Sequence, residues 1–284
     1  MKRIAVLLTT FNRREKTLTC LRSLQQQVLP ADMQLDIFLT DDASSDGTAQ
    51  AVQSAFPGVN LFSGNGSFYW AGGMRHTWRQ ALATRPDHYL LLNDDTTLVP
   101  GAIAVLLQPG EKEGPCICIG STASEGQISY GGWRLRSRRF WKSERVQDDR
   151  IYADCDFGNA NIMLIPKEVV DRIGILAAHF THSLADYDYT LKARKAGFRI
   201  KVAPGFLGSC VDDHGNNWKS AGTTLKERIR YLKSVKGLAY HEYLRFIRDH
   251  FPLSYPSAFF KLWMKTFFPF IWDRFKGERA GNTQ

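Results

Sequence analysis

Residues 88–97 read HYLLLNDDTT, and two adjacent acids, Asp94 and Asp95, follow directly on an apolar run. A run as short as residues 89–92 suits a strand that is buried on both faces. In open α/β sheets, ligands bind in the crevice beyond the carboxyl ends of the strands. The stretch therefore predicts a buried strand that carries two carboxylates into a ligand crevice, where a divalent cation and a diphosphate would sit. A turn or a helix cap is the alternative, because Asp and Asn favour both.

The sequence around this stretch alternates between strand-like and helix-like segments. Strands are predicted at residues 4–9, 35–40, 59–62 and 89–92, and helices at residues 16–27, 48–55 and 73–83. Strands separated by helices imply βαβ units and a mostly parallel sheet, so the fold class is α/β. Each strand ends in polar sequence, namely TTFNR at 9–13, DDAS at 41–44, SGNG at 63–66 and NDD at 93–95. Four such ends of one sheet can converge on a single crevice.

The second half of the chain is less regular at first. Residues 116–156 contain short strand candidates and a basic run at 134–145, which predicts either a mobile loop over the site or a solvated charged loop. Regularity returns with a strand at 161–165, a helix at 166–173 that starts with Pro, a helix at 186–196 that Gly197 ends, and a strand at 198–202.

Composition narrows the class of protein. The 284 residues are 44% hydrophobic and 23% charged, as expected of a soluble globular protein. We expect no signal peptide and no membrane-spanning segment, because no apolar stretch approaches the roughly 18 to 20 residues that a bilayer requires. The five cysteines are scattered without a C-x-x-C pair, which suggests reduced cytosolic thiols. From residue 215 onward, 13 Lys and Arg stand against 5 Asp and Glu, so most of the net charge of +9 lies in the tail.

Four motifs in order resemble those of the family 2 glycosyltransferases, which are inverting enzymes of the GT-A fold. They are TTFNR at 9–13, DDASSDGT at 41–48, NDD at 93–95 in the place of the D-x-D metal motif, and ADYD at 185–188 followed by Leu191, Arg194 and Gly197. The resemblance covers roughly residues 3–215. It implies a GT-A catalytic domain at 1–215, with a nucleotide-sugar half at about 1–100 and an acceptor half at about 101–215. Residues 216–284 would form a helical appendage.

The resemblance also implies a donor site. Asp95 is the expected ligand of a divalent metal, Mg²⁺ or Mn²⁺, with Asn93 able to supply a neutral oxygen where the family has an acid. Asp94 would contact the ribose or the phosphate side. His214 follows the last predicted strand, where several GT-A enzymes place a metal or diphosphate ligand; a surface or core His is the alternative.

The remaining donor contacts come from three loops. Asp41 would accept a hydrogen bond from the base or ribose. Thr9 and Phe11 would present backbone groups and a ring edge to the base, while Asn12 and Arg13 either join them or only start a helix. The loop at 68–75 would close over the ribose and phosphates through Trp70, Gly73 and Arg75; an ordinary solvated Arg is the alternative for Arg75.

Asp186 is the candidate general base, and Asp188 would orient the site or the acceptor. Inverting transfer needs a carboxylate that takes the proton of the acceptor hydroxyl while its oxygen attacks the anomeric carbon. At the start of a helix, Asp186 is also a plausible N-terminal cap. Asn159, in DFGNA at 156–160, either touches a sugar or forms a plain turn.

The tail combines a basic helical stretch at 225–250 with an aromatic face made of Phe259, Phe260, Trp263, Phe267 and Ile271. Such a face with basic neighbours suits a helix lying on an anionic membrane. Packing on the catalytic domain and a dimer contact are the alternatives. Nucleic acid explains the charge less well, because no binding motif accompanies it.

We therefore expect a metal-dependent inverting hexosyl- or deoxyhexosyltransferase. It would move a sugar from a nucleotide-diphosphate donor to a hydroxyl of a glycan acceptor, lipid-linked and part of a bacterial surface polysaccharide. It would be cytoplasmic and peripheral on the inner face of the membrane. The sequence predicts no particular oligomeric state. A sugar-phosphate nucleotidyltransferase and a non-catalytic nucleotide-sugar- or membrane-binding protein are the rivals. The first would carry a Gly-rich phosphate loop, which residues 9–12 lack.

Overall fold

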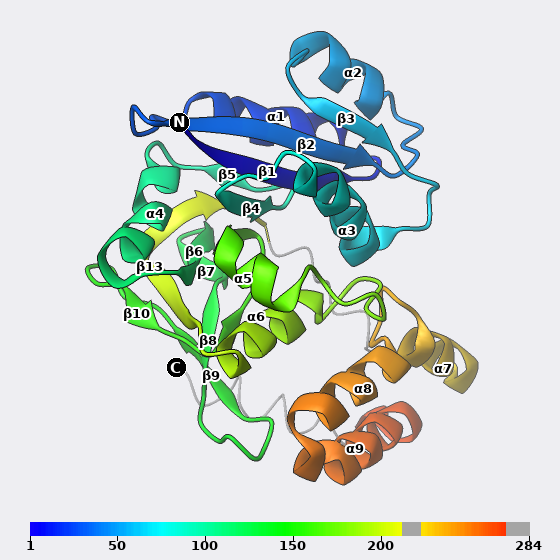
Figure 1. The fold of residues 1–284 in the computed structure, drawn as a ribbon. Coiled ribbons are helices and arrows are strands. Elements are labelled where there is room, and N and C mark those ends of the chain that lie inside the picture. Colours follow the sequence, from blue (N-terminus) through cyan, green and yellow to red (C-terminus); the bar gives the residue numbers. More distant parts are fainter. Residues whose placement is uncertain (212–222, 271–284) are drawn as a thin grey trace. The chain divides into compact units, whose positions relative to one another are not determined.

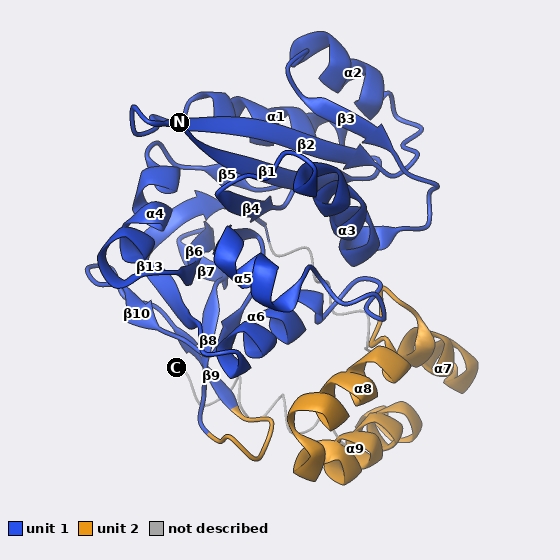
Figure 2. Ribbon diagram, viewed as in Figure 1, with its two compact units in different colours: residues 1–136, 143–212 blue, residues 137–142, 213–284 orange. Residues whose placement is uncertain are grey.

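The computed structural model describes residues 1–211 and 223–270 (Figure 1). By its internal contacts the chain divides into two units, one of residues 1–136 and 143–212 and the other of residues 137–142 and 213–284 (Figure 2). Each unit is described by itself.

A single mixed sheet forms the centre of the first unit (Figure 1). Its strand order is β10-β13-β6-β12-β4-β1-β2-β3, with β5 added on β13 and β7 on β6. The bounds are β1 Lys2–Thr10, β2 Met33–Asp41, β3 Asn60–Ser63, β4 His88–Leu92, β5 Thr97–Leu98, β6 Cys116–Ser124, β7 Gln127–Tyr130, β10 Ala153–Asp154, β12 Ile162–Pro166 and β13 Arg199–Ser209. A small second sheet of order β11-β8-β9 contains β8 Gly132–Leu135, β9 Ser143–Val146 and β11 Phe157–Gly158.

The predicted parallel half is confirmed. β1 pairs in parallel with both β2 and β4, and β2 pairs in parallel with β3. Helices α1 Arg14–Gln25, α2 Thr48–Ala55 and α3 Tyr69–Leu82 connect these strands. The carboxyl ends of β1, β2 and β4 therefore lie at one edge of the sheet, and they carry Thr10, Asp41 and Asn93.

The two faces of this half pack against different helices. Leu8 of β1 belongs to the core cluster that includes Leu21 of α1 and Leu106 of α4 (Ala102–Glu113). Its neighbour Thr9 contacts α3, where a Cβ added to Gly73 would meet the Thr9 hydroxyl oxygen. Because neighbouring residues of a strand point to opposite faces, α1 and α4 cover one face and α3 covers the other.

Residues 101–211 depart from a simple parallel pattern. β12 runs antiparallel to both β4 and β6, while β6 and β13 run parallel to each other. The start of β12 consequently lies beside the end of β4. Helices α5 Lys167–Ile173 and α6 Ala185–Lys195 match the predicted helices to within one residue at each end.

The less regular region begins with a long strand in place of a short one, because residues 116–124 form an almost fully buried central strand. The basic run starts in β8 and ends in β9, and the residues between these strands form a largely exposed loop, in agreement with the solvated-loop alternative. Helix α4 is absent from the predicted elements, because Pro109 and Gly110 are poor helix residues. Burial of Ile103, Leu106 and Leu107 in the core outweighs that penalty.

The second unit contains helices α7 Leu225–Lys233, α8 Tyr240–His250 and α9 Tyr255–Phe267, with a 3-10 turn, η1, at Pro252–Ser254. The basic stretch predicted as one helical region is two helices. Gly237 lies in the break, where it packs so closely on the carbonyl of Tyr231 that a Cβ would clash. Trp141 joins this unit by packing its ring on Phe246 and Phe251, with centroids 5.2 Å and 5.0 Å away. In the described residues, no helix is long and apolar enough to cross a membrane.

Candidate active site

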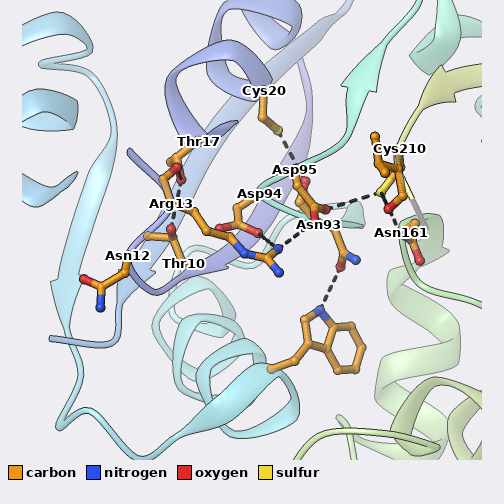
Figure 3. Close-up of polar contacts among 12 residues, drawn as sticks. Thr10, Asn12, Arg13, Thr17, Cys20, Asn93, Asp94, Asp95, Asn161 and Cys210 are labelled. Carbon is orange, nitrogen blue, oxygen red and sulfur yellow. Dashed lines mark hydrogen bonds and ion pairs between the residues drawn. The ribbon is translucent and has the colours of Figure 1, made fainter. Parts of the chain in front are cut away.

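The two acids that end β4 share one cation, the guanidinium of Arg13 (Figure 3). Its Nη1 lies 2.6 Å from Asp95 Oδ2 and 3.2 Å from Asp94 Oδ1. Arg13 immediately precedes α1, so the β1 loop meets the β4 loop in this ion pair. Burial raises the pKa of Asp94 to about 6; the Arg13 guanidinium opposes that rise, and the charge of Asp95 adds to it. The crevice expected from the sequence is therefore a buried acidic site with an internal counter-ion.

Asn93 is held by Trp70 of α3. The indole Nε1 of Trp70 donates to Asn93 Oδ1 at 2.8 Å. An indole N–H can only donate, so this bond fixes the amide with its oxygen toward Trp70 and its NH₂ group turned away. The metal-ligand role predicted for Asn93 stays a prediction, and its side-chain oxygen already has a protein partner. Trp70 itself was expected to contact the donor, which also stays a prediction.

Two buried thiols border the acids, which the sequence patterns did not suggest. Cys20 of α1 donates to the carbonyl oxygen of Asn93, and Cys210 donates to Asp95 Oδ1, each at 3.4 Å (Figure 3). Burial raises the pKa of Cys210 to about 12, with the charge of Asp95 as the next cause. Both thiols are therefore neutral near pH 7, and they act as small hydrogen-bond donors against the acid loop.

Whether a metal fits this site depends on the carboxylate oxygens that have no hydrogen-bond partner in the described protein. Among residues 1–211 and 223–270, no three His, Cys, Asp or Glu side chains gather as a metal cage. Asp94 Oδ2 is buried, and no hydrogen-bond donor of the described chain reaches it. Two carboxylates with a spare oxygen suit Mg²⁺ or Mn²⁺, which are commonly held by one or two protein carboxylates, substrate phosphates and water. The residues thus fit a cation that arrives with a diphosphate. His214 lies outside the described residues.

The β1 and β2 loops are joined through Asn12. Its backbone N–H donates to Ser44 Oγ at 2.9 Å, and its Oδ1 accepts from Ser45 N at 2.7 Å. Asn12 has a positive φ of 52°, which Asn tolerates better than most residues. Asp41 is 5% exposed and accepts from the backbone of Ser44 at 3.0 Å. The nucleotide contacts predicted for Asn12 and Asp41 stay predictions, while Phe11 remains 44% exposed beside them.

Asp42 organises the loop before α3, a role that sequence reasoning missed. Its carboxylate accepts from the backbone N–H groups of Gly66, Phe68 and Tyr69, at 2.8, 2.8 and 3.3 Å. Gly64 packs so closely on Asp42 that a Cβ would meet its backbone. The adjacent-acid motif could have indicated this role, because one acid can serve the nucleotide while its neighbour folds a loop.

Arg75 holds the loop at residues 174–184. Its Nη1 donates to the carbonyl oxygens of Ala177 and Phe180 at 2.9 and 2.7 Å, and the residue is 9% exposed. Nearby, the N–H of Ala71 donates to the carbonyl of Thr181 at 3.1 Å. Helix α3 and residues 174–184 are thereby fastened together. The solvated Arg considered from the sequence is wrong, and the phosphate contact of Arg75 stays a prediction.

Asp186 lies in the first turn of α6 and is partly buried. Its carboxylate accepts from Ala160 N at 3.2 Å and from Tyr187 N at 2.9 Å. Leu184, with a φ of 67°, occupies the N-cap position, so the interpretation of Asp186 as the cap is wrong. Burial raises the pKa of Asp186 to about 6, and the hydrogen bonds that it accepts hold the pKa below what burial alone would give. A carboxyl that titrates near 6 is suited to general base work at neutral pH.

The residues around Asp186 fix the start of α6. Asp188 is 2% exposed and pairs with Lys192, whose Nζ lies 2.7 Å from its Oδ2. Arg194 pairs with Asp156 at 2.9 Å, which joins α6 to the strand before Asn159. Asn159 donates from Nδ2 to the Tyr187 hydroxyl at 3.2 Å. The orienting role predicted for Asp188 and the sugar contact considered for Asn159 stay predictions.

One short backbone path connects the donor acids with Asp186. The N–H of Asn93 donates to the carbonyl of Asn161 at 3.1 Å, and the preceding residue, Ala160, donates its N–H to Asp186. The antiparallel pairing of β12 with β4 brings these segments together. The fold therefore connects the two acid motifs, which the sequence separates by about ninety residues, through two hydrogen bonds within the first unit.

This mixed α/β sheet, with two acids directly after β4 and a further acid in the first turn of α6, has the architecture of the GT-A fold. The model of the family described as glycosyl transferase family 2 matches residues 5–174, and the chain belongs to that family. No curated protein sequence matches the chain.

Solved structures agree on the fold. The mannosyltransferase PcManGT from Pyrobaculum calidifontis, in complex with GDP-Man and Mn²⁺, has 17% sequence identity and a TM-score of 0.55 over 80% of this chain. S. aureus TarS 1-349 in complex with UDP has 16% identity and a TM-score of 0.54 over 73% of this chain. The same fragment in complex with UDP-GlcNAc has 15% identity and a TM-score of 0.53 over 82%. The matches span 60%, 59% and 67% of those chains, respectively.

Proposed function

We propose that the protein transfers a sugar, with inversion, from a nucleotide-diphosphate donor to a hydroxyl of a glycan acceptor. The observation that carries this proposal is the backbone path from Asn93 through Asn161 and Ala160 to Asp186. It relates an acid pair suited to a cation and diphosphate to a carboxylate suited to take a proton. Donor and acceptor chemistry need both within one site.

The donor side uses the β4 acids. Asp95 and Asp94 would hold Mg²⁺ or Mn²⁺ together with phosphate oxygens of the donor. The cation would offset the charge that develops on the diphosphate as the sugar departs. The nucleotide would lie over the ends of β1 and β2, where Thr9 is next to last in β1, Phe11 follows β1 and Asp41 ends β2. The mannosyltransferase structure with GDP-Man and Mn²⁺ supports this arrangement by its shared fold.

The acceptor side uses Asp186. Its carboxylate would accept the proton of the acceptor hydroxyl while that oxygen attacks the anomeric carbon from the face opposite the diphosphate. With a pKa of about 6, Asp186 is mostly ionised at pH 7 and still basic enough to bind the proton. The backbone N–H groups of Ala160 and Tyr187 hold the carboxylate in place.

The acceptor we propose is lipid-linked, because the second unit presents apolar rings to solvent. Phe259, Phe260 and Phe267 of α9 are 44%, 62% and 45% exposed, and Lys261 and Lys265 are exposed on the same helix. Trp263, expected on the same face, instead donates from Nε1 to the Tyr240 hydroxyl at 3.1 Å and is only partly exposed. Ile271 lies outside the described residues. Exposed Phe with Lys suits the inner face of an anionic membrane.

A donor screen followed by a transfer assay tests the proposal. UDP-, dTDP- and GDP-sugars are compared by thermal shift with and without Mn²⁺, since a ligand that binds only the folded state raises its melting temperature. The stabilising donor is then incubated with membrane lipid extracts. We expect labelled sugar in the lipid fraction, inverted anomeric configuration in the product, and loss of transfer in EDTA. Transfer that continues in EDTA would contradict the metal, and a retained configuration would contradict the mechanism.

A further inference from the structure

The guanidinium of Arg13 contacts both acids that follow β4 (Figure 3). Asp94 Oδ1 and Asp95 Oδ2 converge on its single nitrogen Nη1, at 3.2 and 2.6 Å. The other oxygen of Asp95 accepts from Cys210. A divalent cation held by this acid pair would draw on the same two carboxylate charges, so the cation and the guanidinium would compete for them.

The enclosure of the three side chains shows which of them can move. The side chains of Asp94 and Asp95 are 7% and 11% exposed, whereas that of Arg13 is 41% exposed. The two acids are nearly enclosed by the protein, whereas the guanidinium that contacts them is partly in solvent. An exposed arginine has many rotamers and can leave its partners without disturbing the core.

The backbone at Arg13 is anchored independently of the ion pair. Its carbonyl accepts from both the N–H and the hydroxyl of Thr17, each at 2.9 Å, and the preceding Asn12 is bonded to Ser44 and Ser45. Release of the guanidinium therefore leaves the loop in place. A guanidinium that swings on a fixed loop at this end of the sheet can reach a diphosphate bound there, for which its fork of donors is suited.

We infer that Arg13 is an internal, displaceable cation: it holds the acid pair in the donor-free enzyme and moves to the donor diphosphate when the metal takes its place. The inference rests on the proposed metal-assisted donor binding. Metal alone must displace the guanidinium without giving it a new partner, so it binds weakly. Diphosphate supplies that partner, so metal and diphosphate strengthen each other's binding by the same factor.

The test measures Mn²⁺ binding by electron paramagnetic resonance, without turnover. Arg13→Gln removes the competing charge, and Arg14→Gln is the matched control, since Arg14 has the same charge one residue later and pairs with Glu15 instead. Without nucleotide, we expect Arg13→Gln to bind Mn²⁺ about 5- to 150-fold more tightly than wild type, the usual range of such coupling. Arg14→Gln should match wild type. Adding UDP or GDP should tighten Mn²⁺ binding in wild type and much less in Arg13→Gln.

Unchanged or weaker Mn²⁺ binding in Arg13→Gln, with wild type binding Mn²⁺ normally, overturns the inference and leaves the proposed function intact. Absence of Mn²⁺ binding in wild type and both variants, with either nucleotide, overturns the proposed metal dependence and this inference with it. Arg13→Lys provides a second reading if Arg13→Gln is poorly folded. A single ammonium holds the pair less well than the guanidinium, so its Mn²⁺ affinity should lie between those of wild type and Arg13→Gln.

Discussion

The N–H of Asn93 donates a hydrogen bond of 3.1 Å to the carbonyl of Asn161, at the point where β4 ends and β12 begins. Asn93 belongs to the acid motif, and Asn161 follows the residue whose N–H binds Asp186. This bond ties the residue after β4 to the residue before β12, so the pairing of these two strands sets the spacing between the proposed metal-binding acids and the proposed base. Substitutions on either side should therefore affect transfer through local chemistry.

Asp186→Asn should lower kcat by about 10²- to 10⁴-fold, the usual contribution of a positioned general base. The N–H groups of Ala160 and Tyr187 donate to different oxygens of Asp186, so the amide oxygen keeps one of these two bonds. We expect a modest loss of stability with the fold and donor affinity retained. Transfer kinetics and donor titration measure the two effects. Asp154→Asn, at an acid whose side chain is 76% exposed, is the control and should transfer sugar normally. Full activity of Asp186→Asn would exclude it as the base.

The pH dependence of kcat/KM should follow the titration of Asp186. The base works only when ionised, and its pKa of about 6 means that protonation removes activity as the pH falls. We expect a rise of about tenfold per pH unit below pH 6 and a plateau above about pH 7. Initial rates in buffers of constant ionic strength test this. A profile that is flat down to pH 4.5 would contradict the raised pKa.

Arg75→Met should destabilise the protein by about 2–4 kcal/mol, because two carbonyl oxygens, one buried and one partly buried, lose a charged donor. The loop at 174–184 would loosen, so the acceptor KM should rise. Urea unfolding measures the stability, and donor titration separates this role from the predicted phosphate contact. If Arg75→Met weakens donor binding while the unfolding midpoint is unchanged, the carbonyl bonds are not what Arg75 contributes.

Asn93→Asp should strengthen Mn²⁺ binding by about tenfold, since affinity rises with the charge of the ligands. The new carboxylate can keep the bond to Trp70 with one oxygen while the other replaces the NH₂ group. In EDTA, the melting temperature of Asn93→Asp should be lower than that of wild type, because three adjacent carboxylates repel one another when no metal is bound. Asn93→Ala is the comparison: it leaves the indole N–H without its acceptor, which should cost about 1–3 kcal/mol with no gain in metal affinity.

Phe260→Ser should weaken binding to anionic vesicles, because it removes an apolar ring that is 62% exposed on α9. The ring is not part of the core, so the substitution should leave the fold stable. Sedimentation with vesicles of phosphatidylglycerol and phosphatidylcholine measures it, and the loss should be larger at high salt, where the lysines contribute less. Thr266→Ser is the control, because Thr266 is buried on the same helix. Equal vesicle binding of both variants and wild type would direct attention to a protein partner.

Local pattern predicted much of the fold. Residues 48–55 form α2 as predicted, and α6 begins within one residue of the predicted start, because polar strand ends and Gly197 mark these boundaries. The predicted parallel order arises from the same alternation. The failures have a different cause. Pro109 and Gly110 predict that no helix forms at 102–113, but burial of its apolar residues stabilises α4. The antiparallel course of β12 depends on its pairing with β4, which is far away in the sequence.

The sequence indicated the candidate acids but not the side chains that contact them. Asp94, Asp95 and Asp186 are candidates from sequence alone because carboxylates at strand and helix ends are typical of ligand and base chemistry. The contacts of Arg13 with Asp94, Trp70 with Asn93 and Arg75 with Ala177 join residues 81, 23 and 102 positions apart. No local pattern encodes such pairs. Asn93 stands where the D-x-D motif has an acid, and only the structure shows that its side-chain oxygen accepts a hydrogen bond from the indole of Trp70.

The fastening of α3 to residues 174–184 has a practical consequence for protein engineering. Arg75 grips the loop at Ala177 and Phe180, and Ala71 holds Thr181. A chimera that imports only an acceptor loop from another transferase would arrive without the helix that shapes it. The loop and α3 should therefore be exchanged together. Because Trp70 of α3 also contacts Asn93, such an exchange would alter the proposed donor site as well.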